Sequence, residues 1–171
     1  MYKSTLLYNY IIMFRCTTTY KSDTLTEAAA TDLYNQLVYS VRWHDGIRSR
    51  GGFTRKAYMV PPTDSLMPVL CSVIKLSLNA LKNKQNYAIM GIYINYYVDG
   101  TMYAPNHSHK GSHQLVLSLG ATRTLTVGKK EFAMNNGSSI IFGGSVHGVP
   151  KEPSVSAGRI SIAAFLKPFN I

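Results

Sequence analysis

Hydrophobic residues recur with a helical period in two stretches of the first half of the chain. Thr24 and Glu27 form a capping-box pattern, in which side chains bond the free backbone N–H groups of a first helical turn. An apolar stripe then continues to about residue 41, and a second one runs from about Met67 to Lys82. The pattern therefore predicts two helices, separated by a break at Pro61-Pro62.

From Tyr87 onward, apolar and polar residues alternate, which is typical of strands with one buried face. The alternation predicts strands at about 88–97, 114–119, 121–127, 130–134, 138–142 and 158–165. Residues 1–20 are predicted to add one or two strands, and Gly128-Lys129 and Asn135-Asn136-Gly137 are hairpin signals. Short strands after a helical first half indicate a small barrel or a double-sheet roll flanked by helices.

The composition places these elements in one folded domain. A chain of 171 residues can bury one hydrophobic core, and 46% hydrophobic against 15% charged residues excludes a disordered tail. The apolar run from Tyr8 to Phe14 is too short to span a bilayer and lacks a signal-peptide cleavage site, so we interpret it as a strand. Cys16 and Cys71 form no metal or disulfide motif, which favours a reducing compartment. We expect a monomeric cytoplasmic protein that does not bind membranes.

The charge of the chain changes the expected partner. A formal net charge of +10, from 18 Lys and Arg against 8 Asp and Glu, favours nucleic acid first and an anionic membrane second. Six residues of one glycine-rich segment could bind phosphates or stack on bases: Trp43, Arg48, Arg50, Arg55, Lys56 and Tyr58. This mixture predicts a loop that faces DNA or RNA, and a solvated basic loop is the alternative.

Histidines supply the candidate metal ligands. Three of the five histidines, His107, His109 and His113, lie within seven residues, and His147 follows about forty residues after the first. Residues two apart in a strand point to one face, about 6.6 Å apart, so His107 and His109 can meet at one ion. A third imidazole must then come from another strand, as His147 would. Neutral imidazole suits iron, zinc, copper and nickel.

The last predicted strand carries a charge on an otherwise apolar segment. Arg159, Ser161, Ala163 and Phe165 share one of its faces. A buried guanidinium is costly unless an anion lies beside it. With only eight acidic residues in the chain, a ligand carboxylate or phosphate is the favoured partner; an acidic side chain, or an edge-strand arginine in solvent, remain alternatives.

Together, these segments resemble the AlkB-like branch of the Fe(II)- and 2-oxoglutarate-dependent dioxygenases, over roughly residues 24–165. The resemblance is carried, in that family's order, by Trp43, Thr54 to Tyr58, Asn95-x-Tyr97-x-x-Gly100, His107, Leu117 to Arg123, Gly137 to Phe142, His147 to Lys151 and Arg159 to Ser161. It implies one dioxygenase domain over residues 1–171, of the α+β class. The domain would have a double-stranded β-helix (jelly-roll) core with N-terminal helices packed on it.

The resemblance also implies roles for individual residues. His107 and His147 would ligate Fe(II), and His109 stands where that family has a carboxylate ligand; His113 stays open as a competing ligand. Arg159 would pair with the distal carboxylate of 2-oxoglutarate. The cosubstrate pocket would be completed by the polar residues Asn95, Tyr97 and Ser161. Phe165 stands where that family has a second arginine.

The implied activity uses Fe(II), 2-oxoglutarate and O2 to demethylate or hydroxylate a base that is flipped out of DNA or RNA. Two alternatives stay open. One is a catalytically impaired AlkB-like module that only binds nucleic acid. The other is a three-histidine oxygenase that acts on a small molecule or a protein side chain.

Overall fold

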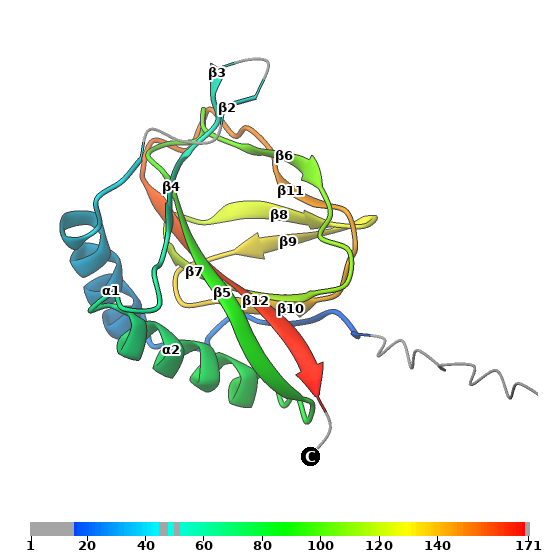
Figure 1. Cartoon of the computed structure of the whole chain (residues 1–171). Helices are drawn as coiled ribbons and strands as arrows, with labels where there is room; N and C mark the ends of the chain where they lie inside the picture. Colours follow the sequence, from blue (N-terminus) through cyan, green and yellow to red (C-terminus); the bar gives the residue numbers. More distant parts are fainter. Residues whose placement is uncertain (1–15, 45–47, 50–51, 170–171) are drawn as a thin grey trace, which may run out of the picture.

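A computed structural model of the chain describes residues 16–44, 48–49 and 52–169, and its strands form two facing sheets (Figure 1). The larger sheet has the strand order β1-β10-β7-β12-β5-β4, and the smaller one β6-β11-β8-β9. In these orders, the strands of the larger sheet span Thr19–Lys21, Ser139–Phe142, His113–Gly120, Arg159–Phe169, Asn86–Tyr97 and Lys56–Met59. Those of the smaller sheet span Ala104–His107, His147–Val149, Arg123–Val127 and Lys130–Met134. A separate hairpin consists of β2 (Arg48–Ser49) and β3 (Gly52–Phe53).

All strand pairs in the described part of the chain are antiparallel, and the chain passes repeatedly from one sheet to the other. This is the double-stranded β-helix that the sequence predicted. The turn at Gly128-Lys129 joins the paired strands β8 and β9, as expected of a hairpin. The prediction of a hairpin at Asn135 to Gly137 is wrong, because β9 belongs to the smaller sheet and β10 to the larger. Gly137 has a φ of 79°, and a Cβ there would lie 2.6 Å from the Leu25 carbonyl oxygen, so this crossover requires glycine.

The two helices, α1 (Glu27–Ser40) and α2 (Met67–Ala80), lie together on the side of the larger sheet that faces away from the smaller one (Figure 1). Both predicted helices are therefore confirmed. The N-cap of α1 is Thr26 and not Thr24: the Thr26 hydroxyl accepts from the Ala29 N–H at 3.3 Å, whereas the Thr24 hydroxyl contacts Ser139. Within the described residues, neither helix has the length and apolarity needed to cross a membrane.

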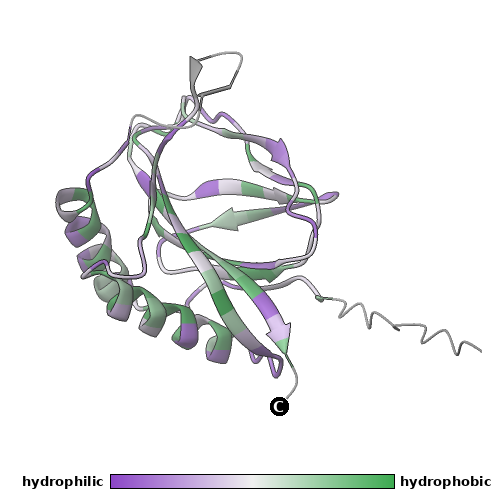
Figure 2. Ribbon diagram, in the orientation of Figure 1, coloured by the Kyte–Doolittle hydropathy of each residue, from purple (hydrophilic) through white to green (hydrophobic). Residues whose placement is uncertain are grey.

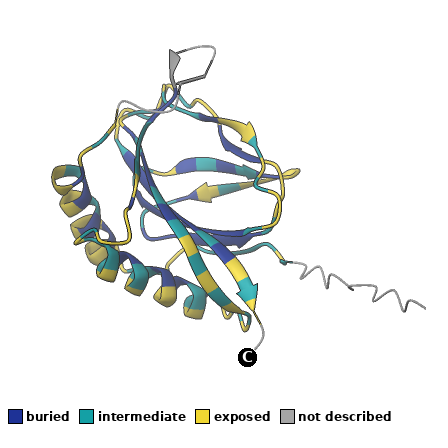
Figure 3. Cartoon of the chain, in the orientation of Figure 1, coloured by how far each residue is buried: buried dark blue, intermediate teal, exposed yellow. Residues whose placement is uncertain are grey.

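The pleat of the larger sheet separates two cores. Along β12, Ile160, Ile162, Ala164 and Leu166 pack towards the helices, while the intervening residues face the smaller sheet. Apolar residues form the layer under the helices and part of the layer between the sheets. They alternate with polar residues along the helices and strands (Figure 2), and the exposed residues of α1 and α2 lie on their outer sides (Figure 3). The inner layer, between the two sheets, is where the predicted functional residues converge.

The sequence analysis did not predict several of the short strands. β4, β6 and β11 have only four, four and three residues, so the alternation of apolar and polar positions has no room to show. The strand that we expected within Tyr8 to Phe14 lies outside the described residues. In the described part of the predicted range, residues 16–20, β1 begins at Thr19.

Candidate metal centre

Strand pairing brings two histidines from distant parts of the sequence side by side. His107 at the end of β6 is the direct partner of His147 at the start of β11, and their ring centroids are 4.4 Å apart. His109 follows two residues after β6, with its ring 4.9 Å from that of His107 and 5.5 Å from that of His147. One nitrogen of each ring lies within 4.8 Å of the other two. At metal–nitrogen distances of about 2.1 Å, neighbouring nitrogens on one ion lie about 3.0–3.4 Å apart, so side-chain rotations that close these separations by about 1–2 Å would bring all three onto a single metal.

Backbone carbonyls set the tautomer of two of these rings. Nδ1 of His107 bonds to the Pro105 carbonyl oxygen at 2.7 Å, and Nδ1 of His147 bonds to the Ser145 carbonyl oxygen at 2.8 Å. A carbonyl oxygen only accepts, so Nδ1 carries the proton in both rings. Nε2 therefore keeps its lone pair, which is the arrangement that histidine ligands of metals use.

Burial favours the neutral forms of two of the three rings, His147 and His109. Burial lowers the pKa of His147 to about 4; the neighbouring His107 and His109 add to this, and the bond to Ser145 opposes it. Burial, and then His107, lower the pKa of His109. Two phenylalanine rings form the apolar wall: Phe142 lies 4.8 Å from His147, and Phe165 lies 4.9 Å from His109. Neutral imidazoles at pH 7 are what metal ligation requires.

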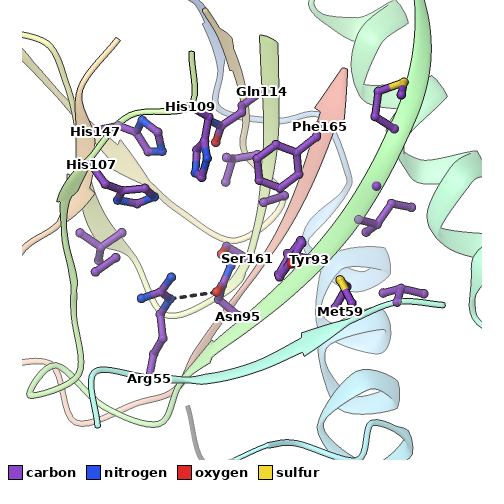
Figure 4. Close-up of a pocket in the computed structure, with 18 of the residues that line it drawn as sticks. Arg55, Met59, Tyr93, Asn95, His107, His109, Gln114, His147, Ser161 and Phe165 are labelled. Atoms are coloured by element: carbon purple, nitrogen blue, oxygen red, sulfur yellow. Dashed lines mark hydrogen bonds between the residues drawn. The ribbon is translucent and has the colours of Figure 1, made fainter. Parts of the chain in front are cut away.

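The structure also separates the two candidates for the third ligand. His109 joins the cluster (Figure 4). His113 opens β7, and its Nδ1 forms a hydrogen bond of 3.0 Å with the Tyr87 hydroxyl. The geometry therefore favours His109 over His113 as the third ligand.

A cavity of about 1110 Å³ opens beside the histidines, between the two sheets (Figure 4). Eight residues that the sequence singled out line it: Arg55, Asn95, Tyr97, His107, His109, His147, Arg159 and Ser161. The four residues predicted to share one face of β12, from Arg159 to Phe165, all contribute to its wall. The predicted metal ligands and the predicted cosubstrate residues thus belong to one site.

Arg159 is a buried cation that forms no ion pair with the residues that the structure describes. Its side chain is 1% exposed, its Nε donates to the Ser118 hydroxyl at 2.8 Å, and its guanidinium lies 5.3 Å from the Tyr97 ring centroid. Its Nη2 has no hydrogen-bond partner among the described residues. Burial lowers the pKa of Arg159, and the Tyr97 side chain opposes this effect. An unpaired guanidinium N–H inside a cavity fits a ligand carboxylate, which can accept its hydrogen bonds.

Arg123 on β8 is equally buried, but each of its three nitrogens is hydrogen bonded. Its Nε donates to Glu152 Oε2 at 2.7 Å and forms the buried end of an ion pair. Its Nη1 donates to the Asp99 carbonyl oxygen, and its Nη2 to those of Met102 and Pro150. Arg123 therefore ties two loops, β5–β6 and β11–β12, to the smaller sheet, a structural role that the sequence analysis did not identify.

Asn95 and Ser161 face each other across the β5–β12 pair, at the middle of the cavity. The Asn95 Nδ2 donates to the Ser161 hydroxyl at 3.4 Å, and the Asn95 Oδ1 accepts from Arg55 Nε at 2.8 Å. Arg55 is only 8% exposed and also donates to the Thr54 hydroxyl. The structure thus places Arg55 inside the cavity, and the expectation that it lies on an exposed phosphate-binding loop is wrong.

The pleat of β4 splits the predicted nucleic-acid segment. Along β4, Lys56 and Tyr58 point to the opposite face from Met59, because successive side chains of a strand alternate. Arg55, just before the strand, lines the cavity together with Met59. The Tyr58 hydroxyl donates to Asp64, and its ring stacks on His44.

Trp43 does not reach the cavity either. Its indole N–H donates to the Val38 carbonyl oxygen at 3.3 Å, and its ring packs 5.2 Å from that of Tyr96. The structure therefore does not bring Trp43, Lys56 and Tyr58 to the site. The side chain of Arg48, and Arg50 as a whole, lie outside the described residues.

Sequence reasoning missed two residues at the site, Gln114 and Tyr93, both of which line the cavity (Figure 4). Gln114 is 2% exposed, and its Nε2 has no partner in the described part of the chain. The sequence contained one indication that Gln114 faces the site: Gln114, Val116 and Ser118 form one face of a predicted strand, and this face includes two polar residues. Its other face is entirely leucine.

Solved structures of 2-oxoglutarate and iron oxygenases share this fold. OsALKBH1 matches with a TM-score of 0.68 at 16% identity, over 88% of this chain and 98% of its own. An oxidoreductase of the 2OG-Fe(II) oxygenase family from Burkholderia pseudomallei matches with 0.62 at 13%, over 88% and 84%. The viral collagen prolyl hydroxylase of Paramecium Bursaria Chlorella virus-1, in complex with 2-oxoglutarate, matches with 0.58 at 13%, over 87% and 94%.

No protein-family model and no curated protein matches the sequence. Identities of this size establish architecture and leave activity to the residues of the site. The chain therefore has the fold of the 2-oxoglutarate- and iron(II)-dependent oxygenases, as its sequence predicted.

Proposed function

We propose that this protein is an iron(II)- and 2-oxoglutarate-dependent dioxygenase. One observation carries the proposal: a single cavity contains three converging imidazoles and a buried guanidinium whose Nη2 has no hydrogen-bond partner among the described residues. Imidazole nitrogens suit Fe(II), and a guanidinium suits a carboxylate. A module that merely binds nucleic acid would have no need to keep both groups oriented and buried.

The residues of the cavity have separable roles in this proposal. Fe(II) bound with 2-oxoglutarate and O2 supplies an oxidant for an unactivated C–H bond. His107, His109 and His147 would hold the ion, with two of the rings fixed by backbone carbonyls. Arg159 would bind the distal carboxylate of 2-oxoglutarate, and the Ser118 hydroxyl orients its guanidinium.

The third histidine sets this site apart from one with a carboxylate ligand. Three neutral ligands leave the ion with its full +2 charge, whereas a carboxylate would reduce it to +1. The three-histidine site is therefore expected to hold the dianionic cosubstrate more strongly and the metal less strongly. Phe165 contributes no charge where a second guanidinium was expected, so Arg159 is the principal anchor.

The proposed substrate is an alkylated base of DNA or RNA. The net charge of +10 supports this substrate class, since phosphate contacts dominate the affinity for nucleic acids. The base must leave its stack to reach a metal at the depth of this cavity. A second candidate is a protein side chain, which the structural likeness to prolyl hydroxylases favours.

Anaerobic titration tests the proposal. Fe(II) and 2-oxoglutarate together should produce the weak visible charge-transfer band of a chelated complex, and Arg159→Met should weaken it at limiting 2-oxoglutarate. Lys75→Met, on an exposed face of α2, is the matched control. Succinate formation is then measured with methylated single-stranded DNA, methylated RNA and a prolyl peptide. Absence of the band at saturating concentrations would overturn the proposal.

A further inference from the structure

Gln114 is a buried polar residue in apolar surroundings. It pairs across the sheet with Phe165 on β12 and with Phe142 on β10, so a phenylalanine stands on each side. The side chain is 2% exposed, and its Nε2 has no partner in residues 16–44, 48–49 and 52–169. It lies at the wall of the cavity beside His109 (Figure 4).

The strand fixes the direction of this side chain. Leu115 and Leu117 belong to the core under the helices, so the alternation of β7 turns Gln114 and Val116 towards the space between the sheets. A buried N–H without an acceptor is costly, and almost all such groups in folded proteins are bonded. A ligand in the cavity is the partner that this geometry leaves open for the Gln114 amide.

The position of Gln114 argues against the distal carboxylate of 2-oxoglutarate as the hydrogen-bond partner of the Gln114 amide. Arg159 and Phe165 are six residues apart on β12, which separates their Cα atoms by about 20 Å in a strand. Gln114 is the direct partner of Phe165 and therefore lies at the opposite end of the cavity wall from Arg159. The Phe165 ring contacts His109, so Gln114 belongs to the end where a reacting carbon would meet the metal.

The surroundings indicate a flat, uncharged ligand. Tyr93 and Phe165 are in edge-to-face contact with centroids 5.6 Å apart, and both line the cavity next to Met59. Aromatic and thioether surfaces of this kind pack on a planar ring, and base–aromatic packing is common in nucleic-acid enzymes. The ring edge of a base offers carbonyl oxygens and ring nitrogens as acceptors.

Resting on the function proposed above, we infer that Gln114 is the substrate-positioning residue of this site. Its Nε2 donates to an acceptor on the edge of the alkylated base, whose ring packs against Phe165 and Tyr93. These three residues take the place of Trp43 and Tyr58, which the sequence suggested for the base and which the structure packs elsewhere.

Two substitutions in the full chain, loaded with Fe(II) and 2-oxoglutarate, test this inference. Gln114→Leu removes the amide, and Gln114→Glu keeps the shape and removes the donor. With methylated single-stranded DNA as the probe, both should raise the KM for DNA roughly tenfold or more, the usual effect of one lost hydrogen bond to substrate. The KM for 2-oxoglutarate should stay within about twofold. Gln36→Leu, on the exposed face of α1, is the matched control.

The outcomes separate this inference from the proposed function. An unchanged KM for DNA, or a rise in the KM for 2-oxoglutarate instead, would overturn the role of Gln114 while the dioxygenase proposal stands. A wild-type protein that forms the charge-transfer band yet leaves methylated DNA and RNA intact would overturn the base as its ligand. Without that band, both proposals fail.

Discussion

Arg159 and Arg123 both hold their guanidinium groups over the ring of Tyr97, 5.3 and 5.6 Å from its centroid, but among the described residues only Arg123 has a hydrogen bond from each of its three nitrogens. Arg123 is bonded to a carboxylate and three carbonyl oxygens. Arg159 donates from Nε to a hydroxyl, and its Nη2 has no partner in the described part of the chain. Arg123 therefore stabilises the fold, whereas Arg159 can donate a hydrogen bond to a ligand.

This contrast predicts opposite effects of the same substitution. Arg123→Met should lower the free energy of unfolding by about 3 kcal/mol, because it leaves the Glu152 carboxylate without its partner. Arg159→Met should leave stability unchanged or increase it, since it removes an unpaired buried cation, while weakening 2-oxoglutarate binding at least about tenfold. Urea denaturation and 2-oxoglutarate titration measure the two quantities. Equal destabilisation by both variants would contradict the assignment.

His109→Asp is expected to tighten metal binding. An anionic oxygen in place of a neutral imidazole lowers the net charge of the site and strengthens its attraction for Fe(II). The dissociation constant is measured by anaerobic titration of the metal-free protein. His44→Asp, at an exposed position outside the cavity, controls for the added charge alone. Weaker binding by His109→Asp would mean that His109 is not directed at the metal.

The metal-free protein should lose stability on acidification. The pKa of His147 is about 4 in the folded chain and about 6.5 in an unfolded one, so the unfolded state binds the proton more readily between these values. The free energy of unfolding therefore falls as the pH drops from about 6.5 to about 4. Urea denaturation with a chelator at about pH 7.5 and about pH 5 measures this fall.

His147→Gln should show a smaller loss of stability between the two pH values, because it has no proton to gain at this position. His44→Gln, an exposed histidine, should behave like the wild type. A wild-type stability that is independent of pH across this interval would show that His147 is not buried as a neutral group.

Nucleic-acid binding should weaken steeply with salt. Each phosphate contact releases counterions, so the logarithm of the affinity falls linearly with the logarithm of the salt concentration. Arg48→Ala with Arg50→Ala should reduce that slope by about 1 to 2 for single-stranded DNA, at about 0.7 per contact. Lys75→Ala with Lys84→Ala, which removes two exposed charges elsewhere, is the control. Binding that does not depend on salt would contradict the interpretation of the basic segment.

Much of this molecule is encoded in local patterns. The helical periods of α1 and α2 and the alternation along β5, β7, β8, β9, β10 and β12 follow from which faces are buried, and burial leaves its period in the sequence. The same alternation assigns Arg159 and Ser161 to one face of β12. The spacing of His107 and His109, two residues apart, already indicates that they point together.

The tertiary structure decides the rest. His147 reaches His107 through the pairing of two strands too short to leave a period, and the spacing of the histidines left His113 open as a competitor of His109 for the metal. Arg55 and Tyr58 are three residues apart in the sequence, but Arg55 lines the cavity, whereas the pleat of β4 turns Tyr58 to the opposite face. Gln114 becomes a candidate only because the structure buries it and leaves its Nε2 without a partner among the described residues. Local periods encode which face of an element is buried; they do not encode which distant element that face meets, and the chemistry of this site depends on that long-range pairing.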